Sequence, residues 1–234
     1  RLVKMAPSIV TAIGPVMMPR MSNIVSQGKT DEQKWYIKSV FDFVTYSSIL
    51  IIVLIVSTMQ DFVPLFFGSK FLKVKELTVI SSPIILLISW GSFFSLQIQI
   101  PMKKEWYLTL SVTSGAIVNF TLNLILIPTY KSLGATIATV IAEFVVVSMQ
   151  IIMIKKLVDV RELFKDIWKH FIAGGITLVA LLIVSKIHLF AVVKIALELL
   201  VGVVLYIIFE HILKSKANNY IVGKFLEIVN RIFK

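Results

Sequence analysis

Glu143 is the residue of this chain whose position most strongly suggests chemistry. It stands in the middle of the apolar stretch 133–154, where a carboxylate is most costly in a bilayer. Ionisable residues at such a depth usually face a bundle interior or a water-filled cavity and serve ion or substrate pathways. Helical spacing sets Glu143 beside a face of small residues, namely Ala135, Ala138 and Ala142. We therefore expect Glu143 to point into protein and to bind H⁺ or Na⁺ as a coupling ion, with a hydrogen-bonded structural glutamic acid as the alternative.

Two asparagines form the second candidate group. Asn119 and Asn123 are one helical turn apart in the apolar stretch 106–128, and Gly115 lies one turn earlier on the same face. Their amides could line a polar cavity, or could link helices and contribute about 0.6 to 2 kcal/mol each. The structural role is slightly favoured.

Other polar residues in or beside apolar stretches have simpler interpretations. Gln97 and Gln99 stand near a helix end, where a side chain reaches the interface at low cost. Lys194 and Glu198 have the spacing of an i,i+4 pair, which predicts a salt bridge within one helix. Glu210 is expected to lie at the membrane interface.

Two cations complete the candidate site. Arg20 follows three prolines, Pro7, Pro15 and Pro19. Proline interrupts the helical hydrogen-bond ladder, and a guanidinium beside such a break either contacts a phosphate or marks a helix end, the commoner case. Lys4 is expected near the opposite membrane surface, facing the cavity. Glu143, Asn119, Asn123, Arg20 and Lys4 are thus the residues predicted to line a substrate or ion pathway.

The sequence does not indicate an enzyme, a cofactor or a metal site. It contains no Walker loop, no GxSxG and no cysteine. The three histidines are dispersed near predicted helix ends: His170, His188 and His211. No catalytic residue is predicted.

The elements that would position these residues are membrane helices. The chain is 57% hydrophobic and 16% charged, with a mean hydropathy of +0.90, whereas soluble domains carry about 25% charged residues. A spanning helix needs about 20 mostly apolar residues. Seven stretches approach that length: 2–19, 40–60, 77–100, 106–128, 133–154, 171–185 and 189–209. We predict an all-α integral membrane protein with about seven transmembrane helices.

The distribution of lysine and arginine predicts the orientation. Sixteen of these residues lie in the segments 20–39, 102–105 and 155–170 and after Ile212, while the alternate loops carry six. Since cytoplasmic loops are enriched in Lys and Arg, the C-terminus is expected in the cytoplasm and Arg1 outside. The formal charge of +11 is then a topological signal, and no nucleic acid partner is expected.

The tail 215–234 has apolar residues at helical spacing, namely Tyr220, Ile221, Phe225, Ile228, Val229 and Ile232. It predicts either an amphipathic helix on membrane lipids or a solvated end.

Three segments of the sequence carry a resemblance to a known family. They are VMMPRMSNIVSQGK (16–29), PLFFGSKF (64–71) and VNFTLNLILIPTYKSLGATIATVIAE (118–143). They resemble the polysaccharide flippase family, the exporters of lipid-linked O-antigen or capsule repeat units that are related to multidrug and toxin extrusion transporters. Lys131 and Ser132 occupy a turn where that family often has glycine.

The resemblance implies the C-terminal lobe of a two-lobe transporter with roughly fourteen helices. Residues 1–154 would form the core helices of that lobe, without its first helix. Residues 155–212 would form two additional transmembrane helices, and residues 213–234 a cytoplasmic tail. The N-terminal half of the same protein would be missing and would act as partner. The implied location is the bacterial inner membrane, with multiple spans.

The function implied by the resemblance is flipping of undecaprenyl-diphosphate-linked repeat units by alternating access. An ion-coupled multidrug or small-molecule exporter, which would also use Glu143, is the first alternative. A membrane-embedded polysaccharide polymerase or glycosyltransferase is less favoured, because the predicted outer loops 61–76, 129–132 and 186–188 are short.

Overall fold

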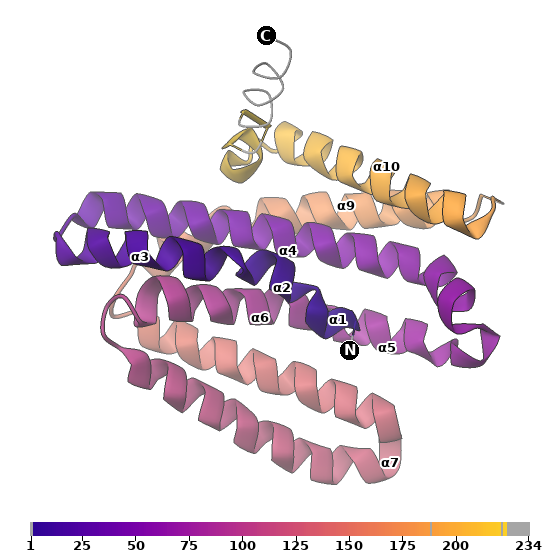
Figure 1. Ribbon diagram of the computed structural model, residues 1–234, viewed down its shortest axis with the longest axis horizontal. Helices are drawn as coiled ribbons and strands as arrows, with labels where there is room; N and C mark the ends of the chain where they lie inside the picture. The colour runs from indigo at the N-terminus through magenta and orange to yellow at the C-terminus, as the bar shows by residue number, and fades with distance from the viewer. Residues whose placement is uncertain (1, 188, 221, 224–234) are drawn as a thin grey trace.

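The computed structural model describes residues 2–187, 189–220 and 222–223 and is all-helical, with no strand among them. Its elements are α1 (Leu2–Met5), α2 (Pro7–Thr11), α3 (Ile13–Ser26), α4 (Thr30–Phe67), η1 (Ser69–Phe71), α5 (Lys73–Ser81), α6 (Pro83–Phe93), the π-helical η2 (Phe94–Gln99), α7 (Glu105–Ile154), α8 (Val160–Phe164), α9 (Trp168–Val184) and α10 (Ala191–Ile212). The long helices lie side by side in one bundle (Figure 1).

Five helices in the described part of the chain are long and apolar enough to cross a membrane. They cover Thr30–Phe67, Lys73–Gln99, Glu105–Ile154, Val160–Val184 and Ala191–Ile212. This confirms the predicted all-helical class with helices suited to a bilayer.

The predicted first stretch, 2–19, does not form one spanning helix. It is divided among α1, α2 and the beginning of α3, of 4, 5 and 14 residues. The prolines explain the division, because each lacks the N–H of a helical hydrogen bond and its ring crowds the preceding turn. Pro7 opens α2 and Pro15 lies in the first turn of α3, while α3 continues past Pro19. The count of seven spans and the two-lobe arrangement therefore stay predictions.

α7 is a hairpin rather than a single rod. At 1.5 Å per residue, its 50 residues would extend about 75 Å, far beyond the ~30 Å hydrocarbon core. Lys131 has the non-helical angles φ 52° and ψ −125°, and the chain reverses there (Figure 1). The two arms, 105–130 and 132–154, correspond to the predicted stretches 106–128 and 133–154.

Close packing at glycine holds the two arms together. A Cβ on Gly115 of the first arm would lie 2.2 Å from a methyl carbon of Val146 and 3.3 Å from the carbonyl oxygen of Ala142. The small-residue face predicted beside Glu143 therefore does pack against a helix, and Ala138 and Ala142 are buried. Small residues let membrane helices approach in this way.

The turns of the bundle gather at two ends (Figure 1). The α3–α4, η2–α7 and α7–α8 connections share one end, and the α4–α5 connection, the turn within α7 and the α9–α10 connection share the other. The first group holds the loops richest in lysine and arginine, so we call it the basic end. The prediction is that the basic end faces the cytoplasm.

The core of the bundle forms where α4 packs against α6, α9 and α10. Aromatic rings fill it toward the basic end: the Phe41 ring lies 5.4 Å from Trp90, 5.1 Å from Phe93 and 5.0 Å from Phe164 between centroids. The Trp90 indole N–H donates to Thr45 Oγ1 over 2.9 Å. These contacts pack α4 against α6 and α8.

Candidate functional site

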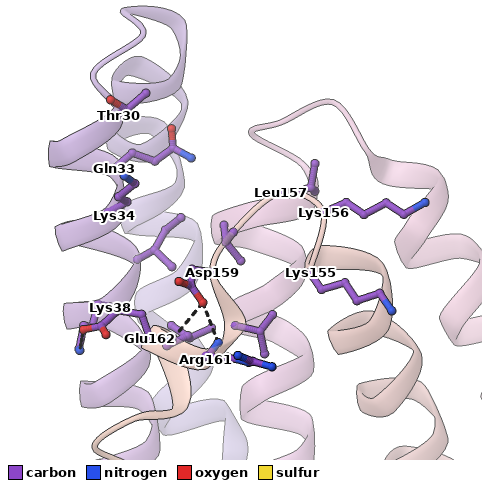
Figure 2. Close-up of a pocket in the computed structure, with 14 residues that line it drawn as sticks. Thr30, Gln33, Lys34, Lys38, Lys155, Lys156, Leu157, Asp159, Arg161 and Glu162 are labelled. Atoms are coloured by element: carbon purple, nitrogen blue, oxygen red, sulfur yellow. Dashed lines mark hydrogen bonds and ion pairs between the residues drawn. The ribbon is translucent and has the colours of Figure 1, made fainter.

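A cavity of about 820 Å³ opens at the basic end between α4, the end of α7 and α8. Five cationic side chains and two carboxylates contribute to its lining. They are Lys34, Lys38, Lys155, Lys156 and Arg161, with Asp159 and Glu162. We call this the basic cavity (Figure 2).

The end of α7 and the start of α8 determine how these residues are placed. α7 ends at Ile154, and Asp159 caps α8 by accepting hydrogen bonds from the backbone N–H of Arg161 (3.0 Å) and Glu162 (3.2 Å). A carboxylate at a helix N-cap also interacts favourably with the helix dipole. Buried Ile154 and Leu163 anchor the connection beneath its charged side chains.

The charges of the basic cavity are unequally compensated. Lys38 pairs with Glu162 and, at 3.5 Å, with Asp166. Within the described part of the chain, Lys155, Lys156 and Arg161 have no carboxylate within 4.0 Å. Figure 2 shows these three side chains directed away from α4. Their uncompensated charge suits a phosphate group, and a guanidinium can bind phosphate oxygens through two parallel hydrogen bonds.

The two candidate asparagines do lie together. Asn123 Nδ2 donates to Asn119 Oδ1 over 2.8 Å on the first arm of α7. Asn123 Oδ1 is buried with no hydrogen-bond partner in the described structure. Glu143 is half-buried on the second arm.

The two candidate cations lie apart from that pair. Arg20 is exposed on α3, and its guanidinium carbon lies 5.2 Å from the centroid of the Tyr36 ring on α4. It does not contribute to the basic cavity. Lys4 belongs to α1, and its side chain is outside the described structure. Whether any of the five candidates lines a pathway stays a prediction.

Glu210, which was expected at the membrane interface, lies near the end of α10, and its side chain packs inside the protein. It is fully buried, with Oε1 2.7 Å from His170 Nδ1. His170, also buried, has its Nε2 2.9 Å from Asp42 Oδ1, and the other Asp42 oxygen accepts from the Ala217 N–H over 3.0 Å. One histidine thus bridges a carboxylate of α4 and a carboxylate of α10. Each buried carboxylate has a partner, as buried charges usually require.

The predicted salt bridge between Lys194 and Glu198 does not form. Lys194 Nζ instead lies 2.9 Å from Asp61 Oδ2 on α4. Glu198 is 0% exposed, and neither of its carboxyl oxygens has a hydrogen-bond partner in the described structure. Lys194, Glu198 and Glu210 stand at multiples of four residues on α10 and are all buried, in a row of side chains that winds around the helix because one turn takes 3.6 residues.

Gln97 and Gln99 do not reach toward an interface. They are 1% and 0% exposed, and Gln97 Nε2 donates to the Gly14 carbonyl oxygen on α3 over 3.0 Å. Both lie in η2. The wider π-helical turn changes which side chains face inward, whereas the prediction rested only on the place of the two residues near a helix end.

Most of the predicted tail helix, at 221 and 224–234, lies outside the described residues. The described portion begins at Ser215, whose hydroxyl accepts from the Asn218 N–H over 3.3 Å.

Comparison of the chain with models of protein families, with curated proteins and with solved structures found no match.

Proposed function

We propose that this chain is part of a membrane transporter that exports a glycan linked to a lipid diphosphate. The observation that carries the proposal is the basic cavity at the end of the bundle where the Lys/Arg-rich loops gather. A diphosphate-linked substrate made in the cytoplasm presents its anionic group at that membrane surface.

The size and charge of the basic cavity fit such a headgroup. Pockets for small molecules usually have volumes of about 300–1,000 Å³, and the basic cavity has about 820 Å³. Its cations exceed its carboxylates, and Lys38 already neutralises Glu162. Lys155, Lys156 and Arg161, which point away from α4 in this structure, would turn toward the headgroup and hold the phosphates through charge-assisted hydrogen bonds, and the lipid tail would stay in the bilayer.

The resemblance to polysaccharide flippases supports the same substrate class, such as O-antigen or capsule repeat units on undecaprenyl diphosphate. In this proposal the helices form one lobe, and alternating access arises when it rocks against a facing lobe from the N-terminal half of the same protein. The membrane would be the bacterial inner membrane, with the basic end in the cytoplasm.

An ion-coupled exporter of small molecules is the second candidate, and the buried ionisable residues of α4, α9 and α10 favour it. Such residues inside membrane helices commonly serve ion or substrate pathways.

Transport by the full-length protein in lipid vesicles separates the two functions. One vesicle set carries a fluorescent lipid-diphosphate glycan in the leaflet at the basic end, and a second set contains a cationic dye. We expect the glycan lipid to appear in the opposite leaflet faster than in protein-free vesicles, with no dye efflux. Dye efflux without glycan movement would establish the second candidate instead.

A further inference from the structure

Four of the five buried residues of α10 carry polar side chains. Its buried residues recur every fourth position: Lys194, Glu198, Gly202, Tyr206 and Glu210. At 1.5 Å per residue this row extends roughly 24 Å, most of a ~30 Å hydrocarbon core. The remaining surface of α10 is largely apolar, with exposed Val192, Leu199 and Ile208. α10 therefore turns its ionisable residues toward protein.

Contacts along this row fix its partners on α4 and α9. Lys194 meets Asp61 of α4. About two turns further along α10, a Cβ on Gly202 would lie 2.6 Å from a methyl carbon of Leu54 on α4 and 3.0 Å from a methyl carbon of Leu181 on α9. Toward the basic end, Tyr206 donates to the Tyr46 carbonyl oxygen over 3.1 Å. Glu198 lies between the Lys194 and Gly202 contacts, inside the three-helix junction.

Glu198 is the unpaired member of this junction. The charged groups near it are Asp61 of α4 and Lys194 of its own helix. From α9 the uncharged Leu181, which is fully buried, approaches Gly202 one turn from Glu198. Lys194 is engaged by Asp61 at 2.9 Å, so no counter-ion is left for a Glu198 carboxylate. Burying a carboxylate without a partner is unfavourable, and the packing therefore favours the neutral acid.

Lys194 has two possible partners that lie on different helices. Glu198 is one turn away on α10, the distance at which an i,i+4 ion pair forms. Asp61 is on α4 and its side chain is 21% exposed, so water can solvate it if Lys194 leaves. A metal cation needs several ligands, and no group of three or more His, Cys, Asp or Glu gathers among the described residues, whereas a proton needs only the Glu198 carboxylate.

We propose that Glu198 is a proton-binding site that controls the salt bridge between α4 and α10. When the Glu198 carboxylic acid releases its proton to water, the carboxylate attracts the Lys194 ammonium group. The Lys194–Asp61 bridge then breaks, and Asp61 becomes hydrated. Proton binding reverses these steps and restores the link between α4 and α10. If the proposed transport function holds, this exchange is where H⁺ drives it.

Infrared spectroscopy of the full chain in lipid nanodiscs tests this directly, because a protonated carboxylic acid has its own carbonyl band. We expect a band at neutral pH that disappears as the pH rises and is absent in Glu198→Gln. Glu32→Gln, which changes an exposed glutamate on α4, is the matched control and should keep it.

Two further variants should move the band in opposite directions. Lys194→Met removes the cation that would stabilise the carboxylate, so the band should persist to a pH about one unit higher, a tenfold change in proton concentration. Asp61→Asn releases Lys194 toward Glu198, so the band should be lost at a lower pH than in the unmodified chain.

A spectrum without any Glu198-dependent band at neutral or mildly acidic pH overturns the proposal. So does a band whose pH dependence is the same in the unmodified chain and in both variants. These outcomes are separate from the vesicle assay: a band that behaves as expected in a chain that moves no glycan lipid leaves the proton site standing and removes the transport proposal.

Discussion

Replacing His170 by leucine removes the residue that joins α4 to α10 at the basic end. His170 lies 2.9 Å from Asp42 and 2.7 Å from Glu210, and all three residues are buried. Leucine fills a similar volume but offers neither a charge nor a hydrogen bond. Because both carboxylates then lose their partner inside the protein, we expect His170→Leu to lower the free energy of unfolding by about 3–5 kcal/mol.

Equilibrium unfolding in mixed detergent micelles, followed by the circular dichroism of the helices, measures this loss. His211→Leu is the matched control, since it changes a histidine of α10 that is exposed. Its effect should stay within about 0.5 kcal/mol, as for ordinary surface substitutions.

A triple variant separates lost charge pairing from lost packing. Combining His170→Leu with Asp42→Asn and Glu210→Gln removes the unpaired charges, so it should recover a large part of the stability lost by His170→Leu alone. A loss below about 1 kcal/mol in the single variant, or no recovery in the triple variant, would refute the description of His170 as a charged bridge.

Three further predictions concern the packing, the hairpin and the topology. Gly174→Val should destabilise the chain by about 1–3 kcal/mol, because a Cβ there lies 2.4 Å from a methyl carbon of α4; Gly175→Val, with no atom within 4 Å, should have a much smaller effect in the same unfolding assay. Lys131→Gly should stabilise the hairpin by about 1 kcal/mol, because glycine adopts φ 52° without steric cost, and a loss of stability would contradict this. The chain has no cysteine, so in intact cells a membrane-impermeant maleimide should label Lys186→Cys and leave Lys156→Cys unlabelled; the opposite pattern would invert the predicted orientation.

Composition and charge distribution were sufficient to predict the helical class and the loops that share an end. Apolar residues in long runs allow few structures in a bilayer, because each backbone hydrogen bond must be made within the segment. The turn at Lys131 could also be predicted from the sequence, because the resembled family often has glycine at that turn. Lys131 has a positive φ in the structure. Such features depend on local sequence alone.

The ionic partners could not be predicted, because they depend on contacts between distant segments. Lys194 has Glu198 within one turn, yet it pairs with Asp61, which is 133 residues away in sequence. His170 and Glu210 each stand near a helix end, and packing of α9 and α10 on α4 buries both. The four-residue spacing on α10 was the available signal, and it was recognised only for Lys194 and Glu198.

Binding of a short-chain prenyl diphosphate to the full-length protein in detergent tests the central claim, that the basic cavity receives a diphosphate headgroup. A variant with Lys155→Gln, Lys156→Gln and Arg161→Gln should bind it at least about tenfold more weakly, because each charge-assisted hydrogen bond contributes about 1.5–3 kcal/mol. The matched control changes three lysines at the opposite end of the bundle, Lys70→Gln, Lys73→Gln and Lys75→Gln, and should bind as the unmodified protein does. Equal affinities for all three proteins would contradict the account.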